Sequence, residues 1–485
     1  MESNREPGSP QQRRVVIVGG GMAGTRLAQQ LVASAGVGVG VGVGVGVGVG
    51  VGTGPVALDV TVIGEEPHPA YNRVLLAEVL AGRYAPEVIA LPVPAAGAGA
   101  EVRRLSGVRV VRVDRPTAEV LCDDGRRVPY DALVLATGSN PVLPPLRGLF
   151  EPDGRDDLHA LPEGVHAFRT MDDCLALGAA VRPGTRAVVI GGGLLGVSAA
   201  RALAQRGAQV VLAHQGEHLM ERQLDPGASR LLRRHMAALG VEVHTECRVR
   251  GLRTRVAGPG GGGRAARAVR AVELADGYAL EADLVVLACG VRPRVGLARA
   301  AGLEVAHGIV VDDELRTSDP WVFAIGDCAE HDGVVYGLAG PAQEQADVLA
   351  RLLAPTPPLP EPRGLRPLAP HRGSAPDPAP QSPEGLDFRY TGTRALTRLT
   401  LASTSGPLDL AAFGNPTPAP GDDVIHLTDA TRNTYRKVVV RGDRLLGGIL
   451  LGDLGTVGAL ARAWEGDEPL PATPLLHLLT NDGGS

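Results

Sequence analysis

Short runs of consecutive apolar and β-branched residues recur along the chain, and several of them end in glycine or another small residue. The run at 13–18 passes into Gly-Gly-Gly-Met-Ala-Gly and then into a stretch with the hydrophobic spacing of a helix. The run at 186–190 passes in the same way into Gly-Gly-Gly-Leu-Leu-Gly. Continuous apolar runs of this length are typical of strands buried on both faces, and the pattern that follows is typical of a helix. We therefore predict an α/β protein with two strand–turn–helix units.

Both glycine turns have the spacing G-x-G-x-x-G, which is typical of dinucleotide-binding sites. The first glycine permits a sharp turn, the second lets backbone N–H groups approach a pyrophosphate, and the third packs the helix close to the sheet. The helix N-terminus adds unpaired donors and the positive end of its dipole. One such turn also occurs without any ligand, whereas two in one chain predict two bound dinucleotides. The residues concerned are Gly19, Gly21 and Gly24, with Met22 and Ala23 between them, and Gly191, Gly193 and Gly196, with Leu194 between them.

The remaining periodic segments complete an alternating pattern of strands and helices. We expect helices over 22–34, 71–82, 341–353 and 456–464. We expect strands over 58–63, 109–114, 119–122, 132–139, 209–213, 268–274, 284–288, 435–440 and 445–451, and a glycine-rich hairpin loop over 258–263.

Polar residues at strand ends are the first candidates for ligand binding. Glu65 and Glu66 follow the strand expected over 58–63, where a carboxylate can accept both hydrogen bonds of an adenosine ribose, and the sequence does not separate the two. The corresponding position of the second unit is His214, so the usual reason to favour NADH is missing. Asp327 ends another strand, where it either hydrogen-bonds a polyol chain or only caps a turn.

Small residues end two further buried strands, where we expect the backbone to touch a ligand. The first such end is Ala136-Thr137-Gly138, and the second is Ala288-Cys289-Gly290. Gly326 precedes Asp327 in the same manner. We therefore include Ala136, Thr137, Gly138, Gly290 and Gly326 among the cofactor-binding residues.

Two low-complexity segments interrupt the pattern. Eight Val-Gly pairs occupy 37–52, and their glycine content disfavours a membrane-spanning helix, so we expect a surface loop. Glu65 lies 41 positions after Gly24, and 25 remain without the 16 repeat residues, near the roughly 20 expected between a glycine turn and its ribose-binding acid. The proline-rich stretch over 354–386 is expected to be an extended linker.

Composition and charge exclude several functions. The 485 residues suffice for about three domains, and 44% are apolar but only 3% aromatic. The net charge of −5 offers no basic surface for nucleic acid. The five cysteines form no CxxC pair, which disfavours a disulfide scaffold, a metal site or an iron–sulfur cluster and fits a cytoplasmic protein. The polar N-terminus shows no signal peptide.

The two glycine turns, the strand ending in Gly326-Asp327 and the order of the pieces resemble the FAD-dependent pyridine nucleotide-disulfide oxidoreductase superfamily. The motifs at 71–76 (YNRVLL), 218–225 (HLMERQLD) and 435–440 (YRKVVV) are similar to the FAD/NAD(P)H module of the assimilatory nitrite reductase large subunit, and NADH:rubredoxin reductases are close relatives. The resemblance implies FAD on the first unit and NAD(P)H on the second. It also implies Arg73 near the flavin, Val111 at the adenine, backbone contacts from Thr137 and Gly138, and Asp327 at the ribityl chain.

The fold that the resemblance implies has two three-layer Rossmann-like dinucleotide-binding domains and a small α+β C-terminal domain. The expected boundaries are 1–160 and 285–353 for the two parts of the FAD-binding domain, 161–284 for the NAD(P)H-binding domain, 354–386 for the linker, 387–470 for the C-terminal interface domain and 471–485 for a tail.

Three departures from related proteins restrict the expected chemistry. No cysteine lies between Glu65 and Arg103, so we do not expect the thiol chemistry of the disulfide reductases. Glu78 stands where related reductases often place a lysine near the flavin. The chain also lacks the cysteines that the iron–sulfur and sirohaem segments of nitrite reductase large subunits require.

We expect hydride transfer from NAD(P)H to FAD, followed by electron transfer to a separate acceptor, either a sirohaem nitrite reductase or a small redox protein. The cofactor supplies this chemistry, so no catalytic side chain is predicted. The alternatives are a standalone NAD(P)H oxidase or diaphorase, and an FAD-binding regulatory protein with little turnover. The final domain is expected to form a homodimer interface rather than a partner site. No membrane or nucleic-acid partner is expected.

Overall fold

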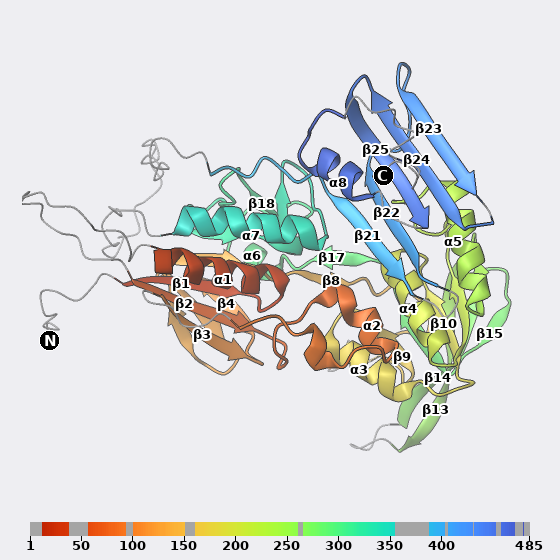
Figure 1. Cartoon of the computed structure of the whole chain (residues 1–485). Helices are drawn as coiled ribbons and strands as arrows, with labels where there is room; N and C mark the ends of the chain where they lie inside the picture. The colour runs from red at the N-terminus through yellow and green to blue at the C-terminus, as the bar shows by residue number, and fades with distance from the viewer. Residues whose placement is uncertain are drawn as a thin grey trace, which may run out of the picture. The chain divides into compact units, whose positions relative to one another are not determined.

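The structure of the chain is a computed structural model, shown in Figure 1. It describes residues 12–37, 57–93, 100–150, 161–259, 265–354, 388–402, 406–429, 431–452, 457–470 and 479. The Val-Gly repeat after Val37, the proline-rich linker after Ala354 and the expected tail except Leu479 lie outside these residues.

The chain divides into two compact units, each built from three separate segments. The first comprises Met1–Asn72, Ala90–Ser139 and Pro293–Thr393. The second comprises Arg73–Ile89, Asn140–Arg292 and Arg394–Ser485. The segment that begins at Arg73 and the C-terminal segment therefore belong to the same unit as the second glycine turn. This unit also extends past 284, the boundary expected from the sequence.

A parallel five-stranded sheet forms the centre of the first unit, in the order β19-β7-β1-β2-β3. Its apolar runs are buried on both faces, as a parallel sheet covered by helices requires. Helices α1 and α7 lie side by side (Figure 1) and are joined by an ion pair of 2.7 Å between Arg26 and Asp347. The elements are β1 (Gln12–Val18), β2 (Ala57–Gly64), β3 (Ala100–Ser106), β7 (Ala132–Leu135), β19 (Val322–Ala324), α1 (Met22–Val37) and α7 (Ala339–Leu353).

Smaller elements complete the first unit. An antiparallel three-stranded sheet consists of β4 (Val110–Asp114), β5 (Glu119–Cys122) and β6 (Arg127–Pro129). A parallel pair consists of β18 (Ile309–Val311) and β20 (Ala329–His331). Two short helices are α6 (Gly296–Ala300) and the 3₁₀ helix η3 (Gly326–Cys328).

The second unit contains a parallel sheet of the same kind, in the order β12-β11-β10-β16-β9. Thr170 starts α3 with a capping box, and Asp225 caps α5 by accepting the Ala228 N–H at 3.0 Å. The elements are β9 (Val165–Ala167), β10 (Arg186–Ile190), β11 (Gln209–Ala213), β12 (Val241–His244), β16 (Leu284–Leu287), α3 (Met171–Ala180), α4 (Leu194–Gln205) and α5 (Pro226–Ala238). Strands β8 (Ser139–Pro141) and β17 (Val291–Pro293) span the boundaries between the units.

The segment that begins at Arg73 packs against α3 and α4. Instead of one helix over 71–82, it forms η1 (Arg73–Leu75), α2 (Leu76–Leu80) and η2 (Pro86–Ile89). Glu78 accepts a hydrogen bond from Arg201 of α4, whose side chain is only 1% exposed. Glu78 therefore compensates a buried cation. An antiparallel sheet of β13 (Val249–Pro259), β14 (Ala265–Leu274) and β15 (Ala279–Glu281) also belongs to this unit.

The C-terminal segment forms an antiparallel sheet in the order β21-β22-β25-β24-β23. Trp464 packs against Phe413, with ring centroids 5.6 Å apart. The elements are β21 (Leu396–Leu401), β22 (Leu408–Gly414), β23 (Asp423–Asp429), β24 (Thr434–Arg441), β25 (Arg444–Gly452) and α8 (Val457–Glu465). The described part of the chain holds no helix long and apolar enough to cross a membrane.

Asp225 connects α5 with the C-terminal sheet inside the second unit. One carboxylate oxygen accepts from the Tyr435 hydroxyl at 2.6 Å and from the Lys437 ammonium at 3.0 Å. Burial alone would raise the pKa of Asp225, but the donors of Ala228, Tyr435 and Lys437 together hold that pKa below its ordinary value. The motifs at 218–225 and 435–440 thus meet through this carboxylate.

Candidate dinucleotide sites

The first glycine turn joins β1 to α1 and fits tightly against β7. Gly19 has a φ of +129°, and a Cβ on this residue would lie 2.0 Å from the Ala136 carbonyl oxygen. A Cβ on Gly24 would lie 2.1 Å from the Gly19 carbonyl oxygen. Both positions therefore exclude any side chain, as close packing of the helix on the sheet requires.

Gly21 differs from its two neighbours in the motif, because a Cβ there would meet no atom within 4 Å. The missing side chain leaves open space beside the first turn of α1, a 16-residue helix. Backbone N–H groups and the positive end of the helix dipole face an anion at such a position. The turn therefore fits the pyrophosphate of FAD, with Met22 and Ala23 in the first turn of the helix.

Glu65 and Glu66 follow β2, but they have different partners. Glu65 forms an ion pair of 2.6 Å with Arg294, and it is partly exposed. Glu66 accepts a hydrogen bond from the buried Tyr71 hydroxyl at 2.7 Å. Gly64 lies against the glycine turn, since a Cβ on it would be 3.4 Å from the Gly20 Cα. Glu65 directly follows Gly64, so it is the first carboxylate after the contact between the end of β2 and the glycine turn.

Asp327 lies in η3 and is held by a neighbouring hydroxyl. Ser139 donates a hydrogen bond of 2.9 Å to one of its carboxylate oxygens. The Gly326 N–H donates to the buried Gln345 side chain at 2.7 Å, and Gly326 itself adopts a φ of +77°. A Cβ on Gly326 would lie 3.1 Å from the Ala23 Cβ. The structure therefore brings Gly326 and Asp327 next to the first turn of α1.

The strand end at Ala136-Thr137-Gly138 is tied to the segment after β17. The Thr137 hydroxyl donates to the Arg294 carbonyl at 2.8 Å, and the Arg294 N–H donates to the Gly138 carbonyl at 2.9 Å. Arg294 thereby connects this strand end with Glu65.

The second glycine turn repeats the geometry of the first. A Cβ on Gly191, whose φ is +116°, would lie 2.3 Å from the Ala288 carbonyl oxygen. A Cβ on Gly196 would lie 1.8 Å from the Gly191 carbonyl oxygen. Gly193, which caps α4 just before Leu194, again has open space around it. The same cradle for a pyrophosphate is therefore present in each unit.

His214 follows β11 and contacts the second glycine turn. Its Nδ1 accepts a hydrogen bond of 3.1 Å from the Gly192 N–H, which places the proton of the neutral ring on Nε2. Burial lowers the pKa of His214, so the imidazole is neutral at pH 7. A neutral imidazole in this place offers no carboxylate to a ribose.

The positions of Val111, Arg73 and Gly290 in the fold are as follows. Val111 lies at an irregularity of β4, in the separate three-stranded sheet, and is 45% exposed. Arg73 belongs to the second unit, where its guanidinium donates to the Arg169 carbonyl. Gly290 follows β16 with a φ of +101°, and its carbonyl accepts the Val142 N–H at 2.9 Å.

Sequence reasoning missed three polar residues beside the first site. Ser139 and Arg294 contact Asp327 and Glu65, as described above. Arg104 of β3 places a guanidinium nitrogen 3.7 Å from the position of a Cβ on Gly20. Burial lowers the pKa of Arg104. The strand of Arg104 was not expected from the sequence, and no local signal marks these residues.

Relatives that are 31% identical cover most of the chain. The NAD(P)H nitrite reductase of Bacillus subtilis (strain 168) is 31% identical over 451 residues, which are 91% of this chain and 46% of that protein. The assimilatory nitrate reductase electron transfer subunit of the same organism is 31% identical over 441 residues, 91% of this chain and 48% of that protein. The chain thus spans about half the length of these relatives.

Solved structures agree with the fold. A chain of the covalent putidaredoxin reductase–putidaredoxin complex has a TM-score of 0.71 and 25% identity, covering 97% of this chain and 96% of that chain. The NADH:rubredoxin oxidoreductase of Clostridium acetobutylicum has a TM-score of 0.61 and 17% identity, covering 96% and 97%.

Family profiles match both parts of the chain. Residues 407–465 match the C-terminal domain of rubredoxin NAD+ reductase, and residues 13–346 match the pyridine nucleotide-disulphide oxidoreductases. Members of the latter family bind FAD and are NAD(P)H-dependent oxidoreductases. The fold class and the resemblance expected from the sequence are thereby confirmed. With two matching glycine turns and a family match over more than half of its length, the chain belongs to the pyridine nucleotide-disulphide oxidoreductase family.

Proposed function

We propose that the chain is a flavoprotein reductase that takes a hydride from NAD(P)H onto FAD and passes the electrons to a separate acceptor. The observation that carries this proposal is the repeated cradle, with one open glycine, Gly21 or Gly193, in each unit. FAD, when bound, supplies the hydride-accepting and electron-donating chemistry. The protein contributes binding and orientation.

The residues around the first turn have distinct roles in this proposal. Gly21 lets the backbone approach the pyrophosphate, and Glu65 or Glu66 binds the adenosine ribose. Asp327, positioned by Ser139, binds the ribityl chain. Arg104 and Arg294 place positive charge beside the phosphates and the ribose-binding acid. The roles expected for Arg73 near the flavin and Val111 at the adenine also remain proposals.

The second turn holds the nicotinamide nucleotide in the same way. Gly193 leaves room for its pyrophosphate, and Leu194 begins the helix that faces it. His214 lies at the adenosine end, and Gly290 lies at the end of the neighbouring strand β16.

The state of the five cysteines supports a mechanism without protein thiols. All five are free, and burial raises the pKa of each thiol. The pKa of Cys174 and that of Cys289 each rise to about 11. A nucleophilic or redox-active cysteine requires the opposite shift, because the thiolate is the reactive form. Free thiols also fit the reducing cytoplasm that we propose as the location.

The acceptor that we propose is either a nitrite reductase component or a small redox protein. This choice rests on the names of the relatives, among them an electron transfer subunit and a complex with putidaredoxin. We also propose a homodimer through the C-terminal sheet, because β23 is an edge strand whose outer backbone groups are available for pairing. Light scattering that gives only a monomer at micromolar concentration would refute the dimer.

Anaerobic titration of the purified protein tests the proposed function. We expect a flavin spectrum that bleaches on addition of NADH or NADPH, and re-oxidation on addition of an artificial acceptor. A protein that binds FAD but stays oxidised with both nucleotides would contradict the proposal. Rapid oxygen consumption without a partner would identify an oxidase instead.

A further inference from the structure

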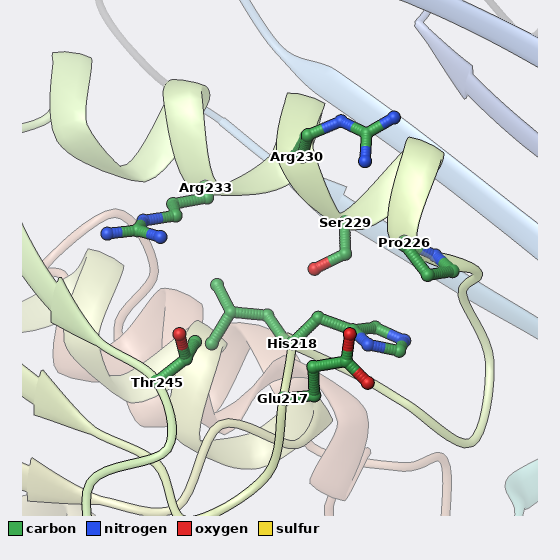
Figure 2. A pocket seen from close by; sticks show the side chains of 8 residues that line it. Glu217, His218, Pro226, Ser229, Arg230, Arg233 and Thr245 are labelled. Atoms are coloured by element: carbon green, nitrogen blue, oxygen red, sulfur yellow. The ribbon is translucent and has the colours of Figure 1, made fainter.

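A pocket of about 150 Å³ lies in the second unit, between the loop after β11 and the N-terminal half of α5 (Figure 2). This volume far exceeds the roughly 10–15 Å³ that one water needs, and it suits one small polar group rather than a whole nucleotide. The lining residues are Glu217, His218, Leu219, Pro226, Ser229, Arg230, Arg233 and Thr245.

Two arginines and one acid line the pocket, so its lining carries more positive than negative charge. Arg230 and Arg233 lie one turn apart on α5, and both side chains are exposed. The Arg233 guanidinium donates a hydrogen bond of 3.4 Å to the Val243 carbonyl, and among the described residues neither Arg230 nor Arg233 forms an ion pair. Glu217 is the single acid among the lining residues. In Figure 2 the Arg233 side chain lies beside the pocket and the Arg230 side chain extends from α5 away from it; both are exposed and can turn towards a bound phosphate.

Polar side-chain atoms facing the pocket are the second indication of a polar ligand. Ser229 is only 2% exposed, and its hydroxyl points into the pocket (Figure 2). The Thr245 hydroxyl faces the same space. His218 donates from Nε2 towards the Leu224 carbonyl at 3.1 Å, while its buried Nδ1 has no partner in the described part of the chain. Buried polar atoms are rarely left unpaired unless a ligand or water satisfies them.

The pocket lies next to the adenosine end of the second dinucleotide site. The glycine turn and the loop after β11 are bonded directly, through the Gly192 N–H to His214 Nδ1 and the Met220 N–H to the Gly192 carbonyl. A dinucleotide whose pyrophosphate rests on Gly193 therefore places its adenosine ribose at the end of β11. Residues 217–219 of the same loop line the pocket.

With His214 at this position, no carboxylate is present at the end of β11 to repel a phosphate on that ribose. A carboxylate at this position would accept the 2′-hydroxyl and repel a 2′-phosphate, whereas neutral imidazole does neither. We propose that Ser229, Arg230 and Arg233 bind the 2′-phosphate of NADPH, so that this reductase prefers NADPH to NADH. This inference rests on the proposed function and names the nucleotide that the second site takes.

Steady-state and anaerobic reductions with each nucleotide test the inference. The double variant R230Q/R233Q is expected to raise the KM for NADPH by roughly 10- to 100-fold, the loss that follows from removing charge-assisted bonds to a phosphate. Its KM for NADH and its kcat stay unchanged, because NADH lacks the 2′-phosphate. S229A is expected to raise the KM for NADPH by a smaller factor. R234Q, a matched change on the same helix outside the pocket, leaves both nucleotides unaffected.

Competition experiments distinguish the source of the phosphate. We expect 2′-AMP to compete with NADPH and to bind the double variant more weakly, with 5′-AMP showing no such loss. Three results would overturn the inference: equal KM changes for NADH and NADPH, a wild-type preference for NADH, or inorganic phosphate that binds the pocket without competing with NADPH. Failure of both nucleotides to reduce the flavin would instead refute the proposed function, and unchanged flavin content and melting temperature exclude misfolded variants.

Discussion

Replacing the middle glycine of either turn by alanine should separate ligand binding from folding. A Cβ on Gly21 or Gly193 meets no protein atom within 4 Å, and neither residue has a positive φ. The G21A apoprotein should therefore be as stable as the wild type, or up to about 1 kcal/mol more stable through a less flexible unfolded chain. The added methyl group instead occupies the space through which the pyrophosphate approaches.

The magnitude follows from the bonds that the methyl group prevents. Moving the pyrophosphate away costs at least one backbone N–H bond to a charged oxygen, about 1.5–3 kcal/mol. This energy corresponds to a Kd for FAD that is roughly 10- to 150-fold higher in G21A. G193A should lose the same factor in affinity for NAD(P)H and keep its FAD.

Equilibrium titration of apoprotein with FAD, followed by flavin fluorescence, measures the first constant, and titration of the oxidised holoenzyme with a non-reducing nucleotide analogue measures the second. Thermal unfolding of each apoprotein supplies the stability comparison. G24A is the contrasting control, because its Cβ would lie 2.1 Å from the Gly19 carbonyl oxygen and should destabilise the fold itself. An unchanged FAD affinity in G21A, with stability also unchanged, would show that no phosphate approaches this turn.

Three further outcomes are expected. K437M removes one donor to Asp225, so it should lower the free energy of unfolding by about 1–3 kcal/mol at pH 7. Because the pKa of Asp225 is lowered in the folded protein, the difference in stability from the wild type should vanish as the pH falls through that pKa. Urea unfolding at several pH values measures this difference. E65Q should weaken FAD binding more than E66Q, because Glu66 is occupied by Tyr71, and equal losses in fluorescence titrations would contradict this assignment. Cys289, with a pKa of about 11, should be alkylated by iodoacetamide at pH 7 far more slowly in the native than in the denatured protein, as mass spectrometry of its peptide can follow.

The parts of the fold that depend on local pattern were predictable from the sequence. The strand expected over 209–213 has the bounds of β11, and the helices expected over 341–353 and 456–464 differ from α7 and α8 by one or two residues. These elements have continuous apolar runs or clear helical spacing. The helix expected over 71–82 was too long: residues 73–75 form the 3₁₀ helix η1, which buries no residue, and only the short helix α2 packs against α3 and α4.

Contacts between distant segments could not be predicted in this way. Asp225 and Lys437 are 212 positions apart, and no periodicity in either segment indicates that they meet. Arg104 and Arg294 reach the first site from a strand and a loop that carry no motif of their own. The glycine turns were found because their chemistry is contained within six consecutive residues. The arginines and the serine of the pocket were not, because their function depends on tertiary placement.

The division of each unit into three segments has a consequence for biosynthesis. The synthesis of strand β10 is complete at Ile190. The C-terminal sheet of the same unit ends at Gly452, 262 residues later. At about 5–20 residues per second, the interval is about 13–50 s. During this time apolar strands such as β10 lack part of their final packing. The sheet of the first unit is likewise incomplete until β19 and α7 have been synthesised. The nascent chain should therefore depend on chaperones, and truncations near the C-terminus should impair nucleotide binding far away in the sequence.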